Sequence, residues 1–402
     1  MKTYMAKLAG VLSVFFLLNL TSTLSLGTSI PEGISRQQSS KHQEFFSHRV
    51  AEIWGEQNVW NPSPTVWVQY ETDLGERSAV DFEHGTVIVQ LLIDSHQDPL
   101  SEEVIAHLHQ GVRNLILGDA EDPVEMVILE EQKKKKPKDS AMENKSYVSH
   151  DLTLGYERKA STENPLLLDQ IRRTNGKEVA LDEVENFTNE VVNIRTISHK
   201  KVKGSDGINR QAVSVKFDLA PNHLEIRARQ FYPIVKASAL KYNLDPSIIM
   251  GIIHTESMFN PRARSQTPAF GLMQLVPGTG AREAYAKIHG ISKSPSAKYL
   301  YDPQSNIQLG VAYFDILLNR YMNQIDHPES RTYCAVAAYN AGAANVGRAF
   351  TPYKSIKKAS PVINNLQPSE VYDRLVEDLN IKEARLYTRK VLTRSVLYSS
   401  WN

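Results

Sequence analysis

Cysteine is almost absent from this chain of 402 residues, which contains only Cys334. A single cysteine cannot form an intramolecular disulfide, and it excludes a metal site built from several thiolates. We expect Cys334 to be a small buried apolar residue. Net charge is lacking too, because 46 Lys and Arg oppose 45 Asp and Glu, which leaves a formal charge of +1. The molecule as a whole is therefore not attracted to nucleic acid, and we expect no nucleic-acid partner.

Long apolar runs are missing after the first residues, and no later segment is apolar enough to cross a bilayer. Residues 1–27 contain Lys2 and Lys7, an apolar run over 8–20, and then small residues up to Gly27. This order is typical of a secretory signal peptide. The run is short for a spanning helix, so an uncleaved anchor is the less favoured alternative. We expect an exported chain, located in the periplasm if the host has two membranes.

The length and composition indicate a soluble globular protein with more than one domain. Hydrophobic residues make up 41% of the chain and charged residues 23%, and 402 residues exceed one ordinary core. We predict an α+β chain. Its expected parts are a mixed α/β domain with a small antiparallel sheet over 37–219 and an all-α domain over 221–402.

The first predicted domain alternates helical and strand patterns. Residues 42–55 have helical apolar spacing, and 65–93 indicate strands separated by the turns "DLGE" and "EHG". A helix should follow, capped by Ser101 and stopped by Gly118. Residues 211–219 alternate like a final strand.

Two basic segments interrupt this region. Residues 131–150 contain Lys133 to Lys136 and Pro137, and residues 199–207 read "HKKVKGSDG". Both could dock on an anionic polymer or a membrane surface. We favour solvated loops, because charge runs are common in loops.

From about residue 221 the pattern becomes helical. Asp245-Pro246 and Asp302-Pro303 each offer an N-cap followed by proline at the first helical position. Pro233 lies within another helical stretch and should kink or restart that helix.

One carboxylate continues an apolar stripe in this region. Counted from the predicted helix start, Glu256 shares a face with Ile249, Ile252 and Ile253, and Asn260-Pro261 must end the helix soon after. Burial and the negative end of the helix dipole both raise the pKa of a carboxyl there. An acid that is still protonated near neutral pH can protonate a leaving oxygen. A structural alternative is a glutamate that points to solvent or pairs with a nearby arginine.

Two later segments could line a groove beside this acid. "GLMQ" over 271–274 joins a glycine that permits close backbone approach to the adaptable Met273 and the hydrogen-bonding Gln274. "AAYNAGAAN" over 337–345 places Tyr339 and Asn340 among small residues. Taken alone, the second segment is better explained by tight helix packing.

Taken in order, these motifs resemble a known family. "ES" at 256–257, "GLMQ", "AYN" at 338–340 and "EARLYTRKV" at 383–391 resemble the lysozyme-like catalytic domain of lytic murein transglycosylases. "AEIWGEQNVW", "RSAVDFEHGTVIV" and "LILGDAEDP" are similar to the extra N-terminal domain of the transglycosylase C type. The resemblance covers most of the chain after the leader.

The resemblance implies cleavage of the β-1,4 bond between N-acetylmuramic acid and N-acetylglucosamine in peptidoglycan, with 1,6-anhydromuramoyl ends as products. Glu256 would act as the single acid and then base, and Tyr387 would hydrogen-bond near it. Ser257 would help to hold the motif. No metal or cofactor is implied. The implied substrate-binding residues are Ser257, Ser265, Met273, Gln274, Tyr339 and Asn340.

Alternatives to this activity stay open at the level of the sequence. A goose-type lysozyme would hydrolyse the same bond with water, and a non-catalytic scaffold would only bind peptidoglycan strands. Type C transglycosylases are lipoproteins, but this leader has no cysteine to carry a lipid. Location at the outer membrane, peripheral membrane association and protein partners are therefore left undecided.

Overall fold

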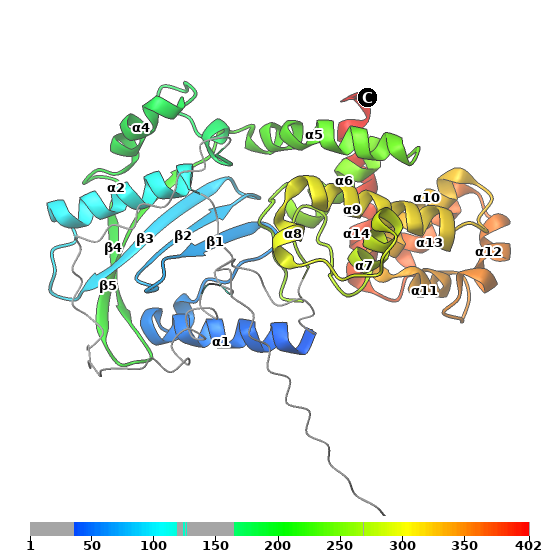
Figure 1. The fold of residues 1–402 in the computed structure, drawn as a ribbon, viewed down its shortest axis with the longest axis horizontal. Helices are drawn as coiled ribbons and strands as arrows, with labels where there is room; N and C mark the ends of the chain where they lie inside the picture. Colours follow the sequence, from blue (N-terminus) through cyan, green and yellow to red (C-terminus); the bar gives the residue numbers. More distant parts are fainter. Residues whose placement is uncertain (1–35, 119–123, 125, 127–164, 268, 402) are drawn as a thin grey trace, which may run out of the picture.

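The computed structural model describes residues 36–118, 124, 126, 165–267 and 269–401. The leader predicted over 1–27 and the whole lysine-rich segment over 131–150 lie outside the described residues. The ribbon has two parts side by side, one built on a sheet and one built of helices (Figure 1). We call the described residues up to 219 the sheet region and those from 220 onward the helical region.

The sheet region contains five antiparallel strands in the order β1-β2-β3-β5-β4. The strands are β1 (Val66–Tyr70), β2 (Glu76–Asp81), β3 (Thr86–Asp94), β4 (Ser198–Lys203) and β5 (Asn209–Asp218). The helices are α1 (Arg36–Trp54), η1 (Glu56–Asn58), α2 (Glu102–Leu117), η2 (Leu168–Gln170), η3 (Leu181–Glu183) and α4 (Val184–Val191).

Each face of the sheet is covered by a helix (Figure 1). Alternate strand residues point to opposite faces, so Trp67 belongs to the core with α2 whereas Val68 belongs to the core with α1. The expected caps of α2 are confirmed, since the Ser101 hydroxyl accepts from the backbone N–H of Val104 and Gly118 ends the helix.

The basic segment 199–207 corrects one prediction. It is not a solvated loop, because Ser198–Lys203 form β4, which pairs with β5 at the edge of the sheet. Within β4 only Val202 is buried. The lysines themselves are compatible with an edge strand, because lysine is common there and hinders pairing with other chains.

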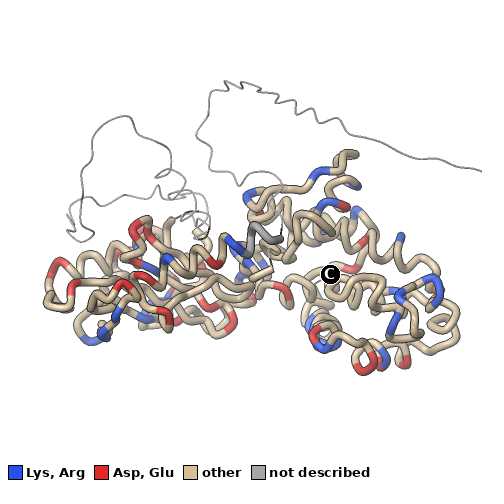
Figure 2. The backbone as a smooth tube through the Cα atoms, turned by 90° about the horizontal axis from the view of Figure 1, so that it is seen from below, with Lys and Arg blue, Asp and Glu red and all other residues tan. Residues whose placement is uncertain are grey.

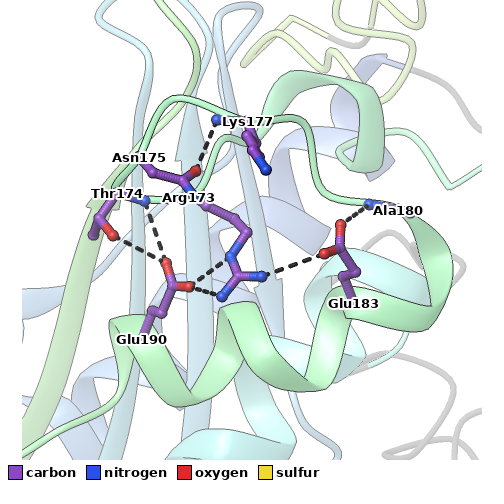
Figure 3. A network of polar contacts seen from close by, with 7 residues as sticks. All are labelled: Arg173, Thr174, Asn175, Lys177, Ala180, Glu183 and Glu190. Atoms are coloured by element: carbon purple, nitrogen blue, oxygen red, sulfur yellow. Dashed lines mark hydrogen bonds and ion pairs between the residues drawn. The ribbon is translucent and has the colours of Figure 1, made fainter.

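A polar network holds the segment that leads into α4 (Figure 3). The Arg173 guanidinium donates to Glu190 at 2.6 Å and to Glu183 at 3.3 Å, and the backbone N–H of Thr174 donates to Glu190. These contacts lie at the surface, where solvent screens them and each contributes little to stability. Together they hold the chain just after η2 against α4.

The helical region contains the remaining helices. They are α5 (His223–Lys241), α6 (Pro246–Ser257), α7 (Gly280–His289), α8 (Ala297–Tyr301), α9 (Pro303–Ile316), η4 (Leu317–Tyr321), α10 (Pro328–Ala341), α11 (Ala343–Val346), η5 (Gly347–Ala349), α12 (Ile356–Asn364), α13 (Pro368–Glu377), α14 (Lys382–Ser395) and η6 (Val396–Trp401). One hydrophobic core runs through them. The predicted α+β class, with a small antiparallel sheet followed by helices, is confirmed.

Several local predictions in this region can be compared with the structure. Asp245 and Asp302 cap α6 and α9, and Cys334 is fully buried, as expected. Pro233 does not restart α5, which runs through it without a break. A proline inside a helix removes one backbone donor, and packing against neighbouring helices outweighs that loss here.

Basic and acidic positions are interspersed along both parts of the backbone (Figure 2), in agreement with the formal charge of +1. Among the described residues, no helix is both long enough and apolar enough to span a bilayer.

Candidate active site

Helix α6 places Glu256 in its last turn. The Asp245 carboxylate accepts from the backbone N–H of Ser247 at 2.8 Å, and Pro246 occupies the first helical position. Ile249, Ile252 and Ile253, on the stripe that Glu256 continues, are fully buried. The helix therefore begins and packs as its sequence predicts.

The Glu256 carboxyl is held towards its neutral form. Its side chain is half-buried, and loss of hydration raises its pKa to about 8. The negative charge of exposed Glu383 raises the pKa further, whereas Tyr387 lowers it. No arginine is among the groups that shift the pKa of Glu256. The surroundings therefore suit a carboxyl that donates a proton better than a carboxylate in an ion pair.

Two tyrosines flank this carboxyl. The Tyr387 hydroxyl, on α14, is buried and close enough to Glu256 to lower its pKa, yet among the described residues it forms no hydrogen bond of ordinary length. Burial raises the pKa of Tyr339, on α10, well above its usual value, and the charge of Glu256 adds to this. Both hydroxyls therefore stay protonated and can donate.

The loop over 271–274 is attached to three helices by side-chain hydrogen bonds to its backbone. Ser257 of α6 donates to the carbonyl of Leu272 at 2.8 Å, and Tyr339 of α10 donates to that of Met273 at 2.9 Å. Asn306 of α9 accepts from the backbone N–H of Met273 at 2.8 Å. The loop is thus fixed to the helix that carries Glu256.

Asn306 is the residue of this site that sequence reasoning missed. Its amide also donates to the carbonyls of Phe270 and Leu300 at 2.9 and 2.7 Å, and its side chain is fully buried. The available signal was an asparagine in the first turn of an otherwise apolar helix face after Asp302-Pro303.

Gly271 is required by the shape of this loop. Its φ is +73°, and a Cβ atom there would lie 2.2 Å from the carbonyl oxygen of Leu300 and 2.4 Å from the Asn306 amide nitrogen. Gln274, three residues later, also has a positive φ of 45°. The backbone of "GLMQ" therefore turns back on itself against α8 and α9.

The predicted substrate-binding residues differ in how they are placed. Gln274 donates to the carbonyl of Gly271 at 3.0 Å, while its buried Oε1 has no hydrogen-bond partner among the described residues. Met273 is fully buried and packs against Gly310. Ser265 accepts from the backbone N–H of Ala269 at 3.2 Å and so closes its own loop. Asn340 is half-buried beside Tyr339.

The structure thus brings Glu256, Ser257, Met273, Tyr339 and Tyr387 together, from three helices and one loop. The site contains one protonated carboxyl, that of Glu256, and the groups beside it are neutral hydroxyls and amides. Within the described ranges there is no group of three or more His, Cys, Asp or Glu side chains that could hold a metal ion.

Family models match both parts of the chain. The Transglycosylase SLT domain matches residues 233–361, and the N-terminal domain of membrane-bound lytic murein transglycosylase C matches residues 34–137. The first match contains Glu256, the "GLMQ" loop and "AYN", and the second contains β1 to β3.

Curated relatives match along most of the chain. Membrane-bound lytic murein transglycosylase C of Photorhabdus laumondii is 32% identical over 350 residues, which are 87% of this chain and 86% of that protein. The proteins of the same name from Shigella sonnei and Yersinia enterocolitica are also 32% identical, over 88% and 86% of this chain and 87% and 86% of their own lengths.

Solved structures match over a smaller part. An inactive mutant of the lytic transglycosylase Slt from Pseudomonas aeruginosa is 28% identical over 42% of this chain and 24% of that one, with a TM-score of 0.33. The 70-kDa soluble lytic transglycosylase from Escherichia coli is 24% identical over the same shares, also with a TM-score of 0.33. The match spans about a quarter of each of these longer proteins.

An identity of 32% that extends over both parts of the chain, and over more than four-fifths of each relative, is the decisive finding. The chain belongs to the family of membrane-bound lytic murein transglycosylase C.

Proposed function

We propose that the chain is a lytic transglycosylase that cleaves the β-1,4 bond between N-acetylmuramic acid and N-acetylglucosamine in peptidoglycan. Glu256 serves first as acid and then as base, and the products carry 1,6-anhydromuramoyl ends. The observation that supports this most directly is a half-buried carboxyl with a pKa of about 8 in the last turn of α6.

In the first step the proton of the Glu256 carboxyl goes to the glycosidic oxygen, and the bond from that oxygen to C1 of the muramoyl residue breaks. A carboxyl that keeps its proton at neutral pH is suited to this role. The positive charge that develops at C1 is stabilised by the N-acetyl group of the same sugar.

In the second step the 6-hydroxyl of that sugar attacks C1, and its proton returns to Glu256. No water is added, and Glu256 ends in its starting protonation state. One carboxyl therefore suffices, whereas most glycosidases use two. In the described chain, Glu383 is the carboxylate whose charge raises the pKa of Glu256, and its own side chain is exposed, so we assign it no chemical step.

The neighbouring side chains would orient the sugar. Tyr387 donates towards Glu256 once the latter is ionised and so eases proton release. The unpartnered Oε1 of Gln274 is available to accept from a hydroxyl or amide of the substrate. Asn340 and the ring of Tyr339 lie beside the reacting sugar. Ser257, Ser265 and Met273 fix the loops that form the binding groove.

The organisation and location that go with this activity are proposals too. We propose a cleaved leader over 1–27, a first domain over 37–219 and a catalytic domain over 221–402. An exported enzyme of cell-wall turnover fits the membrane-bound relatives. We propose that it reaches its substrate from the periplasm.

A hydrolase of the goose-lysozyme type is the nearest alternative, and the products distinguish the two. We expect purified peptidoglycan digested by the protein to give anhydro muropeptides in mass spectrometry. Glu256→Gln should give none, while Glu225→Gln, which changes an exposed glutamate paired with Arg229, should match the wild type. Products one water heavier and no anhydro ends would show a hydrolase, and no products at all from the wild type would favour a scaffold.

A further inference from the structure

We propose that the sheet region positions Glu256, and that Arg227 is the positioning residue through which it does so. This inference rests on the proposed function, because it concerns the same carboxyl. Contacts from the sheet region would then affect the rate of the chemical step.

Arg227 lies in α5 and links three segments. Its Nε donates to the carbonyl of Met258 at 3.1 Å, two residues after Glu256. Its Nη2 donates to the carbonyl of Phe82, in the turn between β2 and β3, at 3.1 Å. Its Nη1 donates to the side chain of Gln170 in η2 and contacts His223 at 2.9 Å. One guanidinium thus joins the end of α6 to two separate segments of the sheet region.

The end of α6 has a conformation that its own residues do not favour. Met258 and Phe259 have φ angles of 53° and 58°, in the left-handed region that residues other than glycine rarely adopt. Such backbone persists only where the surroundings determine it. Phe259 packs in the core of the helical region. The residues on either side of it contact the sheet region, because Met258 packs in the core with α2 and Asn260 donates to the carbonyl of Pro64 at 3.2 Å.

Arginine suits this position because its planar fork presents donors in several directions at once. The side chain of Arg227 is fully buried, and the groups that it contacts in these four hydrogen bonds are neutral carbonyl, amide and imidazole groups. Burial lowers its pKa to about 9, so it keeps its charge at neutral pH. A buried charge without an opposite charge costs stability, and the placement of Glu256 is the benefit that we assign to this costly arrangement.

A second buried arginine provides the matched control. Arg77 is also almost fully buried, and its guanidinium lies between the rings of Trp54 and Trp60, 3.5 and 3.7 Å from their centres. It donates to Gln90 at 3.0 and 2.7 Å. All of these partners belong to the sheet region, so Arg77 supports that region without touching α6.

The test compares Arg227→Met, Gln170→Met and Arg77→Met in the full-length protein. For each variant, kcat and KM are measured on uncrosslinked glycan chains below its unfolding temperature. We expect Arg227→Met to lower kcat by about 10- to 100-fold with KM within about twofold, because a small misplacement of an acid slows the chemical step more than it weakens binding. Gln170→Met should lower kcat by about threefold in the same manner.

Arg77→Met should lower the unfolding temperature but leave kcat within about twofold of the wild type. If Arg227→Met does not fold, Gln170→Met decides alone. A folded Arg227→Met or Gln170→Met with wild-type kcat would overturn the inference, and so would an equal loss of kcat in Arg77→Met. Failure of the proposed function looks different, since then the wild type makes no anhydro product or Glu256→Gln retains activity.

Discussion

Ser257 donates its hydroxyl hydrogen to the carbonyl oxygen of Leu272 at 2.8 Å. The residue directly after Glu256 is therefore joined to the loop that carries Gln274. The two motifs "ES" and "GLMQ" are separated in sequence, but this bond fixes their distance in the fold. The acid and the loop proposed to bind the sugar are consequently linked in the fold.

Ser257→Ala tests this link. It leaves the buried carbonyl of Leu272 without its side-chain partner, so we expect a loss of about 1–2 kcal/mol in the free energy of unfolding. Activity should fall by about tenfold, because the loop is no longer fixed to α6. The control is Ser360→Ala, which removes a buried hydroxyl in α12 and should cost stability without changing kcat/KM. Urea unfolding and steady-state kinetics measure the two effects, and equal activity in both variants would contradict the link.

Gly271→Ala tests the shape of the "GLMQ" loop. The added Cβ would lie 2.2 Å from the Leu300 carbonyl oxygen, so we expect a loss of about 3–5 kcal/mol in the free energy of unfolding. Gly290→Ala is the matched control, because its φ of +74° is almost the same and nothing lies within 4 Å of its added Cβ. That variant should lose only about 1 kcal/mol. Similar losses in the two variants would mean that backbone strain, and not the close approach to Leu300, requires glycine.

Tyr387→Phe tests the role of the flanking hydroxyl. Tyr387 lowers the pKa of Glu256, so its removal should raise that pKa above about 8. The general acid then stays protonated to higher pH, and the alkaline limb of the kcat profile moves upward. Because the hydroxyl has no ordinary hydrogen bond in the described structure, stability should change by less than about 1 kcal/mol. A limb that stays in place or moves to lower pH would argue against this contact.

Glu256→Gln should make the protein more stable at alkaline pH. The folded pKa of about 8 lies above the usual value of a glutamate, so between these values the folded state holds a proton that the unfolded state has lost. Wild-type stability therefore falls as the pH rises through this window. Glutamine does not titrate, and we expect its advantage to grow to about 1–3 kcal/mol at pH 8. Urea unfolding at acidic and alkaline pH measures this, and an advantage independent of pH would refute the raised pKa.

What the sequence predicted best were features set by neighbouring residues. Asp245-Pro246 marks the start of α6, and from there the helical repeat alone places Glu256 on the buried side. The Ser101 cap and the alternating strand residues are local signals of the same kind. Each depends on contacts within a few positions along the chain.

What the sequence did not predict depends on distant contacts. Arg227 meets Gln170 and Phe82, which are 57 and 145 positions away, and nothing in the arginine's own helix indicates them. Asn306 holds Met273 across 33 positions. Because of its lysines, the segment that forms β4 was predicted to be a loop. Pairing with β5 defines this strand, and its own hydrophobicity does not. Tertiary packing decided these three cases.

Digestion of peptidoglycan in water labelled at its oxygen atom tests most directly whether a single carboxyl carries out the reaction. If the sugar's own 6-hydroxyl attacks C1 and gives its proton to Glu256, the new muramoyl ends form without water and carry no label. We therefore predict unlabelled anhydro ends from the wild type and from Glu225→Gln, and no products from Glu256→Gln. Labelled reducing ends from the wild type would show that water attacks C1, and the mechanism proposed for Glu256 would be wrong.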